Sequence, residues 1–172
     1  MKFVIIYFAV LVTATVQVHT ATAVNAWPTG PFSLLQPTGG CPTGMFSGWR
    51  FQDSEDTDNE NHATPADLDS CLNIELNRNL KTYYCTKNST AGTGSWPRGT
   101  YCIAKYGSSC PSGFSSGYVY WDDEDSGNIN GLMHPLPSGE YNRNTRIDFC
   151  CRSDGNHNNP IHLPSTQPFA LY

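Results

Sequence analysis

Residues 96–125 read WPRGTYCIAKYGSSCPSGFSSGYVYWDDED, and residues 27–56 read WPTGPFSLLQPTGGCPTGMFSGWRFQDSED. The two segments align without a gap at an offset of 69, and 11 of the 30 aligned residues are identical. Unrelated segments of ordinary composition would share roughly two. Each segment begins with Trp-Pro, carries Cys-Pro-x-Gly in its middle and ends in an acidic motif. The sequence therefore contains a duplication.

A second match completes each copy. The segment NRNLKTYYCTK at residues 77–87 aligns with NRNTRIDFCCR at residues 142–152, now at an offset of 65. The first repeat therefore covers residues 27–87 and the second covers residues 96–152, with residues 153–172 as a C-terminal tail. A repeat of about 60 residues is small for a hydrophobic core of its own, so we expect the two repeats to share one core.

The segments between the turns favour β-strands. Residues 72–76 and 147–149 alternate apolar and polar side chains, while residues 101–103 and 118–121 are rich in aromatic and β-branched ones. No segment repeats apolar residues with the 3.6-residue period of a helix. Residues 24–172 are therefore predicted to form a single all-β domain, built from two pseudo-symmetric repeats with long loops and stapled by disulfides.

The first residues have the pattern of a secretory signal peptide. Lys2 precedes an apolar run at residues 3–12, and Ala21-Thr22-Ala23 supplies an A-x-A cleavage site. The run is too short to cross ~30 Å of membrane hydrocarbon, which takes about 20 residues. We predict a signal peptide at residues 1–23, a secreted extracellular protein without membrane insertion, and glycosylation of Asn88 in the sequon Asn-Ser-Thr.

Seven cysteines follow the signal peptide: Cys41, Cys71, Cys85, Cys102, Cys110, Cys150 and Cys151. In a secreted chain they are expected to form disulfides, and the lack of C-x-x-C excludes zinc ribbons and thioredoxin-like redox sites. The simplest pairing that respects the duplication is Cys41–Cys85 with Cys110–Cys150. The pairing Cys41–Cys150 with Cys85–Cys110 has the same symmetry and stays open. One further pair comes from Cys71, Cys102 and Cys151, and the odd cysteine is either a free thiol or one end of an intermolecular disulfide.

Charge and motifs argue against several classes of function. The chain has 10 Lys and Arg against 15 Asp and Glu, for a net charge of −5, which disfavours nucleic acid as a partner. The motif H-E-x-x-H does not occur, which excludes a zincin. Contiguous acids are a poor pair for glycoside hydrolysis, which needs two carboxyl groups in different environments. We expect no catalytic residues, and therefore no enzyme.

Nine acidic residues gather in two motifs: Asp53, Glu55, Asp56, Asp58 and Glu60 in the first repeat, and Asp122, Asp123, Glu124 and Asp125 in the second. Both repeats also carry Asn-Arg-Asn before a cysteine. This coupling predicts structural ion pairs of Asp53 or Glu55 with Arg78, and of Asp122 or Glu124 with Arg143. Calcium is the alternative because it binds clustered carboxylates, although neither motif is an EF-hand loop. No other cofactor is expected.

Aromatic residues beside the acidic motifs suit carbohydrate binding. Trp49, Tyr118 and Trp121 can stack on a sugar ring while the acids of residues 122–125 hold its hydroxyl groups. We predict a ligand-binding site at Trp49, Tyr118, Trp121, Asp122, Asp123, Glu124 and Asp125, with Trp121 as its main anchor. The duplication offers two such surfaces, which would let one molecule cross-link bacteria. Trp27 and Trp96 are assigned to the core.

Six short motifs follow one another along the mature chain. They are W-P-x-G-x-Y-C-I at residues 96–103, C-P-x-G-F-x-x-G at 110–117, W-D-D-E-D at 121–125, L-P-x-G at 136–139, C-C-R at 150–152, and P-I-x-L-P with a later P-F at 160–169. Together they resemble the apextrin C-terminal domain, the ApeC module of invertebrate secreted proteins, over essentially the whole mature chain.

The resemblance implies a secreted recognition protein of innate immunity that binds bacterial cell-wall peptidoglycan or muramyl peptides. Apextrin-like proteins are also linked to apical extracellular matrix and adhesion. The alternative function is therefore a matrix or adhesion component without a dedicated glycan ligand. Some relatives carry a pore-forming MACPF domain in front of this module. We expect none here, because the first repeat follows the signal peptide within a few residues.

Overall fold

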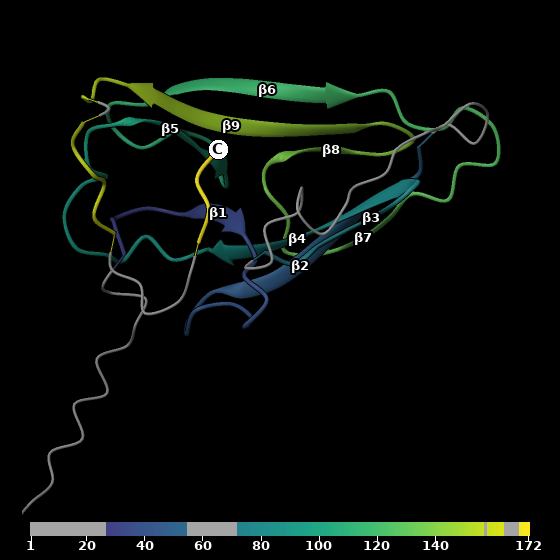
Figure 1. The fold of residues 1–172 in the computed structure, drawn as a ribbon, viewed down its shortest axis with the longest axis horizontal. Helices are drawn as coiled ribbons and strands as arrows, with labels where there is room; N and C mark the ends of the chain where they lie inside the picture. The colour runs from purple at the N-terminus through teal and green to yellow at the C-terminus, as the bar shows by residue number, and fades with distance from the viewer. Residues whose placement is uncertain (1–26, 55–71, 157, 164–168) are drawn as a thin grey trace, which may run out of the picture.

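The computed structural model describes residues 27–54, 72–156, 158–163 and 169–172, and within them the protein is all-β (Figure 1). The strands are β1 (Phe32–Leu35), β2 (Phe46–Gln52), β3 (Ile74–Asn77), β4 (Asn79–Lys87), β5 (Thr100–Lys105), β6 (Ser115–Trp121), β7 (Gly131–Met133), β8 (Gly139–Tyr141) and β9 (Thr145–Ser153). No helix that could cross a membrane occurs among these residues. The predicted signal peptide, and with it Glu55, Asp56, Asp58, Glu60 and Cys71, lies outside them.

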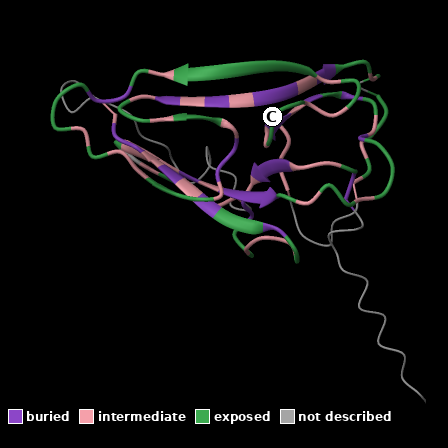
Figure 2. Ribbon diagram, turned by 180° about the vertical axis from the view of Figure 1, so that it is seen from behind, coloured by how far each residue is buried: buried purple, intermediate pink, exposed green. Residues whose placement is uncertain are grey.

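All strands belong to one antiparallel sheet in the order β6-β9-β5-β1-β4-β2-β7, with β3 added on β4 and β8 added on β9. The sheet curls into two layers. Both ribbon views place β6, β8 and β9 above β2, β3, β4 and β7 (Figures 1 and 2). β1 pairs with β5 through Phe32 opposite Lys105 and Ser33 opposite Ala104, and this pair joins the two layers.

The strand register follows the aligned positions of the duplication. Cys85 of β4 lies between Leu34 of β1 and Ser47 of β2. Cys150 of β9 lies in the same way between the residues of β5 and β6 that align with these two, Ile103 and Ser116. β3 and β8 occupy corresponding places beside β4 and β9. β7, which pairs with β2, has no counterpart beside β6 among the described residues.

Two hydrophobic clusters pack on opposite faces of the sheet, where one shared core was expected. Neighbours along a strand point to opposite faces, and Ile103 and Cys150 belong to the first cluster while Ala104 and Phe149 belong to the second. The prediction of one core was therefore wrong in number. The first cluster is nevertheless shared, since it draws on both sequence repeats: Trp27, Phe32, Leu34, Met45, Cys85, Trp96, Tyr101, Ile103 and Cys150.

The C-terminal tail covers the first cluster. Ile161, Leu163, Phe169 and Leu171 pack against it, and the Phe169 ring lies 5.6 Å from that of Trp27. Trp27 and Trp96 are 1% and 3% exposed, in agreement with their assignment to the core. Tyr172 then crosses to the other face, where its backbone exchanges two hydrogen bonds with Cys102.

Three disulfides hold the sheet. Cys41–Cys85 and Cys110–Cys150 occupy aligned positions in the two halves, so the pairing within each repeat is the one found and the pairing across repeats is not. The third, Cys102–Cys151, joins residues directly opposite each other on β5 and β9. Each disulfide is expected to contribute about 2–4 kcal/mol to stability.

Candidate functional site

An aromatic ring, a cation and a carboxylate meet on the outer face of β2, β3 and β4. The Lys81 Nζ lies 4.8 Å from the centre of the Trp49 ring. The same nitrogen lies 4.0 Å from the Glu75 Oε1 and 4.8 Å from the centre of the Tyr83 ring. A hydrogen bond with Tyr83 raises the pKa of Lys81, so this side chain is cationic at neutral pH. We call Trp49, Glu75, Lys81 and Tyr83 the β2 face.

The outer face of β6, β8 and β9 carries the same combination. The Arg146 guanidinium carbon lies 4.4 Å from the centre of the Tyr118 ring, and its nitrogens lie 3.0 Å from Glu140 Oε1 and 3.1 Å from Asp148 Oδ1. Tyr120, next on this side of β6, accepts a hydrogen bond from the Asn144 amide. We call Tyr118, Tyr120, Glu140, Arg146 and Asp148 the β6 face.

The two faces correspond residue by residue through the duplication. Trp49 aligns with Tyr118 and Lys81 aligns with Arg146 at the two offsets of the sequence alignment. They differ in exposure, because Tyr118 is 63% exposed whereas Trp49 is only partly exposed. A ring with a cation over it and carboxylates beside it can stack on a sugar and exchange hydrogen bonds with hydroxyl groups. The structure thus provides two outward surfaces of unequal shape.

Trp121 lies apart from both faces. It is on the inner side of the sheet, packs against the second hydrophobic cluster and lines a cavity of about 270 Å³ between the layers. Trp49 and Tyr118 point outward instead. The three predicted aromatic residues therefore lie on three different surfaces. Trp49 and Tyr118 both lie on the outside, and each has a cation beside its ring.

The acidic motif of the second repeat meets a buried arginine. Arg50 of β2 is 1% exposed and Asp123 is 4% exposed, and the Arg50 Nη2 lies 3.4 Å from the Asp123 Oδ2. Arg50 also donates to the Thr145 Oγ1 and to the Asn142 carbonyl. Burial lowers the pKa of Arg50, and the neighbouring Asp123 opposes this shift. Asp123 also accepts hydrogen bonds from Gln52, Asn130 and Thr145.

Sequence reasoning missed this pair because Arg50 aligns with Val119, so the duplication carries no sign of it. Arg50 stands in an apolar-rich strand segment. A lone charged residue among inward-facing positions was the signal that could have pointed to a buried ion pair. With its oxygens held by four side chains, Asp123 links β2 to Asn130 and to the start of β9 at Thr145, and belongs to the structure of the fold.

Arg143 meets the acidic motif through a different acid than expected. Its Nη2 lies 2.6 Å from Asp125 Oδ1 and also donates to the Asp125 carbonyl, whereas the sequence pointed to Asp122 or Glu124. Both partners are largely exposed, so this pair contributes little to stability. The acidic motif and the Asn-Arg-Asn segment are nevertheless neighbours, since Asn144 Oδ1 accepts from the Asp123 backbone N–H.

In the first repeat, Asp53 accepts a hydrogen bond from the Ile129 backbone N–H. Arg78 lies between β3 and β4 with a φ of 60°. Glu55 lies outside the described residues, and pairing of the first acidic motif with Arg78 stays a prediction. Among described residues, no group of three or more His, Cys, Asp and Glu side chains could hold a metal ion. Asn88 of the sequon is exposed just after β4, and its glycosylation also stays a prediction.

A family model describing the C-terminal domain of apextrin, ApeC, matches residues 27–172. The match covers all three disulfides, both outer faces and the tail. Neither a curated protein nor a solved structure matches the chain with significant similarity. Because the family model spans nearly the whole sequence, the chain belongs to the ApeC family.

Proposed function

We propose that this ApeC protein is secreted and binds bacterial cell-wall peptidoglycan or muramyl peptides as a recognition protein of innate immunity, without catalysis. The family membership and the three disulfides support this proposal, since such bonds persist in oxidising compartments. Trp49 and Tyr118, each under a cation on an outward face, supply the single observation that carries it.

The chemistry of the two faces suits a glycan that bears acidic peptides. An exposed ring such as that of Tyr118 offers a flat apolar surface to a sugar. Arg146 and Lys81 offer positive charge for the carboxylates of a muramyl peptide, in a chain whose net charge is −5. Glu140 and Glu75 hold these cations in place beside the rings.

Two faces on one molecule support agglutination. β2 lies in the lower layer and β6 in the upper layer, so the outer faces look away from each other (Figure 1). A monomer with two such sites could hold two cells, and two weak contacts on one cell would gain avidity. The unequal rings, a partly buried Trp49 and an open Tyr118, predict unequal affinities.

The alternative is an extracellular matrix or adhesion component, and β6 favours it. This strand pairs only with β9 among the described strands, carries no charged residue, and is exposed along its length up to Trp121 (Figure 2). Uncharged, exposed edge strands readily pair with other chains. Assembly through β6 would build a matrix without a glycan ligand.

Depletion from solution separates the two functions. Purified protein is mixed with insoluble peptidoglycan, with cellulose as a control glycan, and the unbound fraction is measured together with the oligomeric state by light scattering. We expect saturable depletion by peptidoglycan alone, competed by muramyl dipeptide, from a monomeric protein. A protein that stays in solution with peptidoglycan and forms concentration-dependent oligomers would support the matrix function instead.

A further inference from the structure

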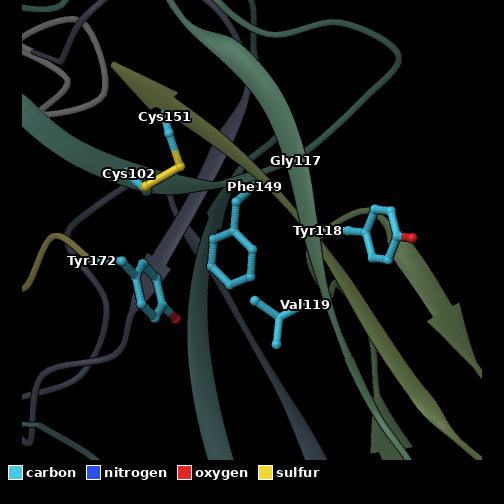
Figure 3. Close-up of a pocket in the computed structure, with 7 residues that line it drawn as sticks. All are labelled: Cys102, Gly117, Tyr118, Val119, Phe149, Cys151 and Tyr172. Atoms are coloured by element: carbon cyan, nitrogen blue, oxygen red, sulfur yellow. A yellow bond between two sulfur atoms is a disulfide. The ribbon is translucent and has the colours of Figure 1, made fainter. Parts of the chain in front are cut away.

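An apolar groove lies between the two layers beside β6. It has two adjoining lobes of about 250 and 270 Å³, and both are lined by Val119, Phe149 and Tyr172. The outer lobe is bounded by the Cys102–Cys151 disulfide and Gly117 (Figure 3). The inner lobe continues between the layers, where its other lining residues are Leu35, Gln52, Ile74, Leu80, Thr82, Tyr84, Trp121 and Ile147.

The side chains of β6 divide between this groove and the outer face. Val119 projects into the space shared with Phe149 and Tyr172, while the Tyr118 ring projects to the other side of the strand (Figure 3). The register agrees, because Val119 lies opposite Ile147 of the second hydrophobic cluster. Val119 is nevertheless 44% exposed. An inward-facing apolar side chain is thus left uncovered by the described residues.

A comparison of two aligned glycines shows why the groove lies here. A Cβ on Gly48 of β2 would come within 1.9 Å of the Pro135 carbonyl oxygen, because the chain after β7 fills that space. A Cβ on Gly117, the aligned residue of β6, would meet nothing within 4 Å. The groove occupies the place beside β6 that has no counterpart of β7 among the described residues.

The side chains that line the groove are mostly apolar, and none of them carries a charge. Burial raises the pKa of the Tyr84 and Tyr172 hydroxyl groups, so both remain neutral. Water gains few hydrogen bonds in such a space, and apolar cavities are characteristically dry and bind apolar molecules.

We propose that this groove binds a linear acyl chain. Each lobe by itself is smaller than an ordinary ligand pocket of ~300–1,000 Å³. A ligand that fills both lobes must therefore be long and thin. A gap between two layers of one sheet excludes a folded partner, and the uncharged lining leaves the polar end of the ligand outside. The chain could belong to a free fatty acid or to an acylated component of the bacterial envelope. The proposal does not depend on glycan binding at the outer faces.

Tryptophan fluorescence can show whether the acyl chain lies in the groove. Of the four tryptophans, Trp27 and Trp96 are buried in the first cluster, Trp49 lies on the β2 face, and Trp121 alone lines the groove. Fatty acids brominated near the methyl end should quench a saturable part of the fluorescence of the oxidised protein. Trp121→Phe should abolish that quenching while calorimetry still detects binding. Quenching that survives Trp121→Phe would place the ligand elsewhere and overturn the proposal.

The dependence of affinity on the length of the acyl chain supplies an independent readout. Across unbranched fatty acids of increasing length, affinity should rise by about fourfold per methylene and then level off when both lobes are full. Absence of saturable binding at every length overturns the proposal. A rise without a plateau indicates micelles or surface adsorption and overturns it as well.

A blocking variant and a matched control complete the test. Gly117→Leu directs a side chain into the outer lobe from a position where an added Cβ meets nothing within 4 Å, while Ser116→Leu adds the same side chain to the opposite side of β6. Gly117→Leu should weaken dodecanoate binding at least tenfold and Ser116→Leu should not. Equal binding by both variants contradicts the groove assignment.

A comparison of two acylated ligands distinguishes the two possible sources of the acyl chain. Tighter binding of a 6-O-acyl muramyl dipeptide than of dodecanoate identifies an envelope component, and equal binding identifies a free fatty acid; both support the groove. Deacylated muramyl dipeptide tests the proposed glycan function separately, because its binding should be unaffected by Gly117→Leu.

Discussion

Arg50 and Asp123 form an ion pair between two sequence repeats, with the Nη2 and Oδ2 atoms 3.4 Å apart and both side chains almost fully buried. The pair joins β2 of one layer to the segment that follows β6 of the other. Thr145 and the Asn142 carbonyl accept hydrogen bonds from Arg50, and Gln52, Asn130 and Thr145 donate hydrogen bonds to Asp123. The two layers are thus joined here by a buried polar contact, whereas the groove beside β6 is left uncovered by the described residues.

Replacing Asp123 should be the most damaging change in the acidic motif. Asp123→Ala leaves the Arg50 guanidinium buried without its carboxylate, which costs about 3–5 kcal/mol. Asp122→Ala is the matched control, because Asp122 is exposed and its loss should change stability by less than about 0.5 kcal/mol. Urea unfolding of both variants measures the difference. Equal midpoints would show that the ion pair contributes nothing to stability.

The two outer faces should contribute separately to peptidoglycan binding. Loss of one aromatic anchor, by Trp49→Ala or Tyr118→Ala, should weaken binding by about 1–3 kcal/mol, the scale for a well-packed contact. The double variant should also lose agglutination. Ile129→Ala is the control, since Ile129 is 67% exposed and belongs to neither face. Retained agglutination by a folded double variant would contradict the assignment of both faces.

Peptide mapping without reduction should recover three disulfide-linked pairs: Cys41–Cys85, Cys102–Cys151 and Cys110–Cys150. Since the chain has seven cysteines, Cys71 should be the residue that takes up an alkylating reagent or links two molecules. Cys71→Ser should then abolish both labelling and any covalent dimer. Labelling of Cys102 in the parent protein would contradict the third pair.

Asp154 should make stability depend on pH in the acid range. Hydrogen bonds from Arg152, at 2.5 Å from Nη2 to Oδ2, lower the pKa of Asp154 far below its ordinary value. A carboxylate with a lowered folded-state pKa stabilises fully above its unfolded pKa of about 4, and this contribution is lost as the pH falls toward the folded-state pKa. The parent protein should therefore exceed Asp154→Asn in melting temperature at pH 6. The difference should shrink between pH 4 and pH 2, and a constant difference would refute this role.

The duplication narrowed the choice of disulfides for a physical reason. Aligned cysteines must pair in equivalent ways in a symmetric fold, which left two pairings open, and the structure has the simpler one, Cys41 with Cys85 and Cys110 with Cys150. The all-β class followed from alternation and from the many turn residues. Features outside the duplication could not be predicted in this way. The main examples are Arg50, which aligns with Val119, and strand β7, which has no counterpart beside β6 among the described residues.

The orientation of the β6 side chains was also beyond sequence reasoning. Residues 118–121 read Tyr-Val-Tyr-Trp, four apolar or aromatic residues without an alternating pattern. A shift of one residue exchanges the two sides of a strand. Trp121 therefore could have been assigned to either side, and the structure places it on the inside. The same ambiguity hid the groove, whose lining comes from both layers and from the tail.

The disulfides also determine how the molecule is connected covalently. Cys41–Cys85 closes a loop before residue 88, whereas Cys102–Cys151 and Cys110–Cys150 both close loops after residue 99. No disulfide among the described residues bridges these two parts, and the side chain of Arg98 in the connecting segment is 81% exposed. A single tryptic cut after Arg98 would leave two internally cross-linked fragments, held together by non-covalent contacts such as the β1–β5 and β2–β7 pairings, the shared cluster and the Arg50–Asp123 ion pair. Such fragments could exchange between molecules, giving nicked proteins that reassemble as complementary halves.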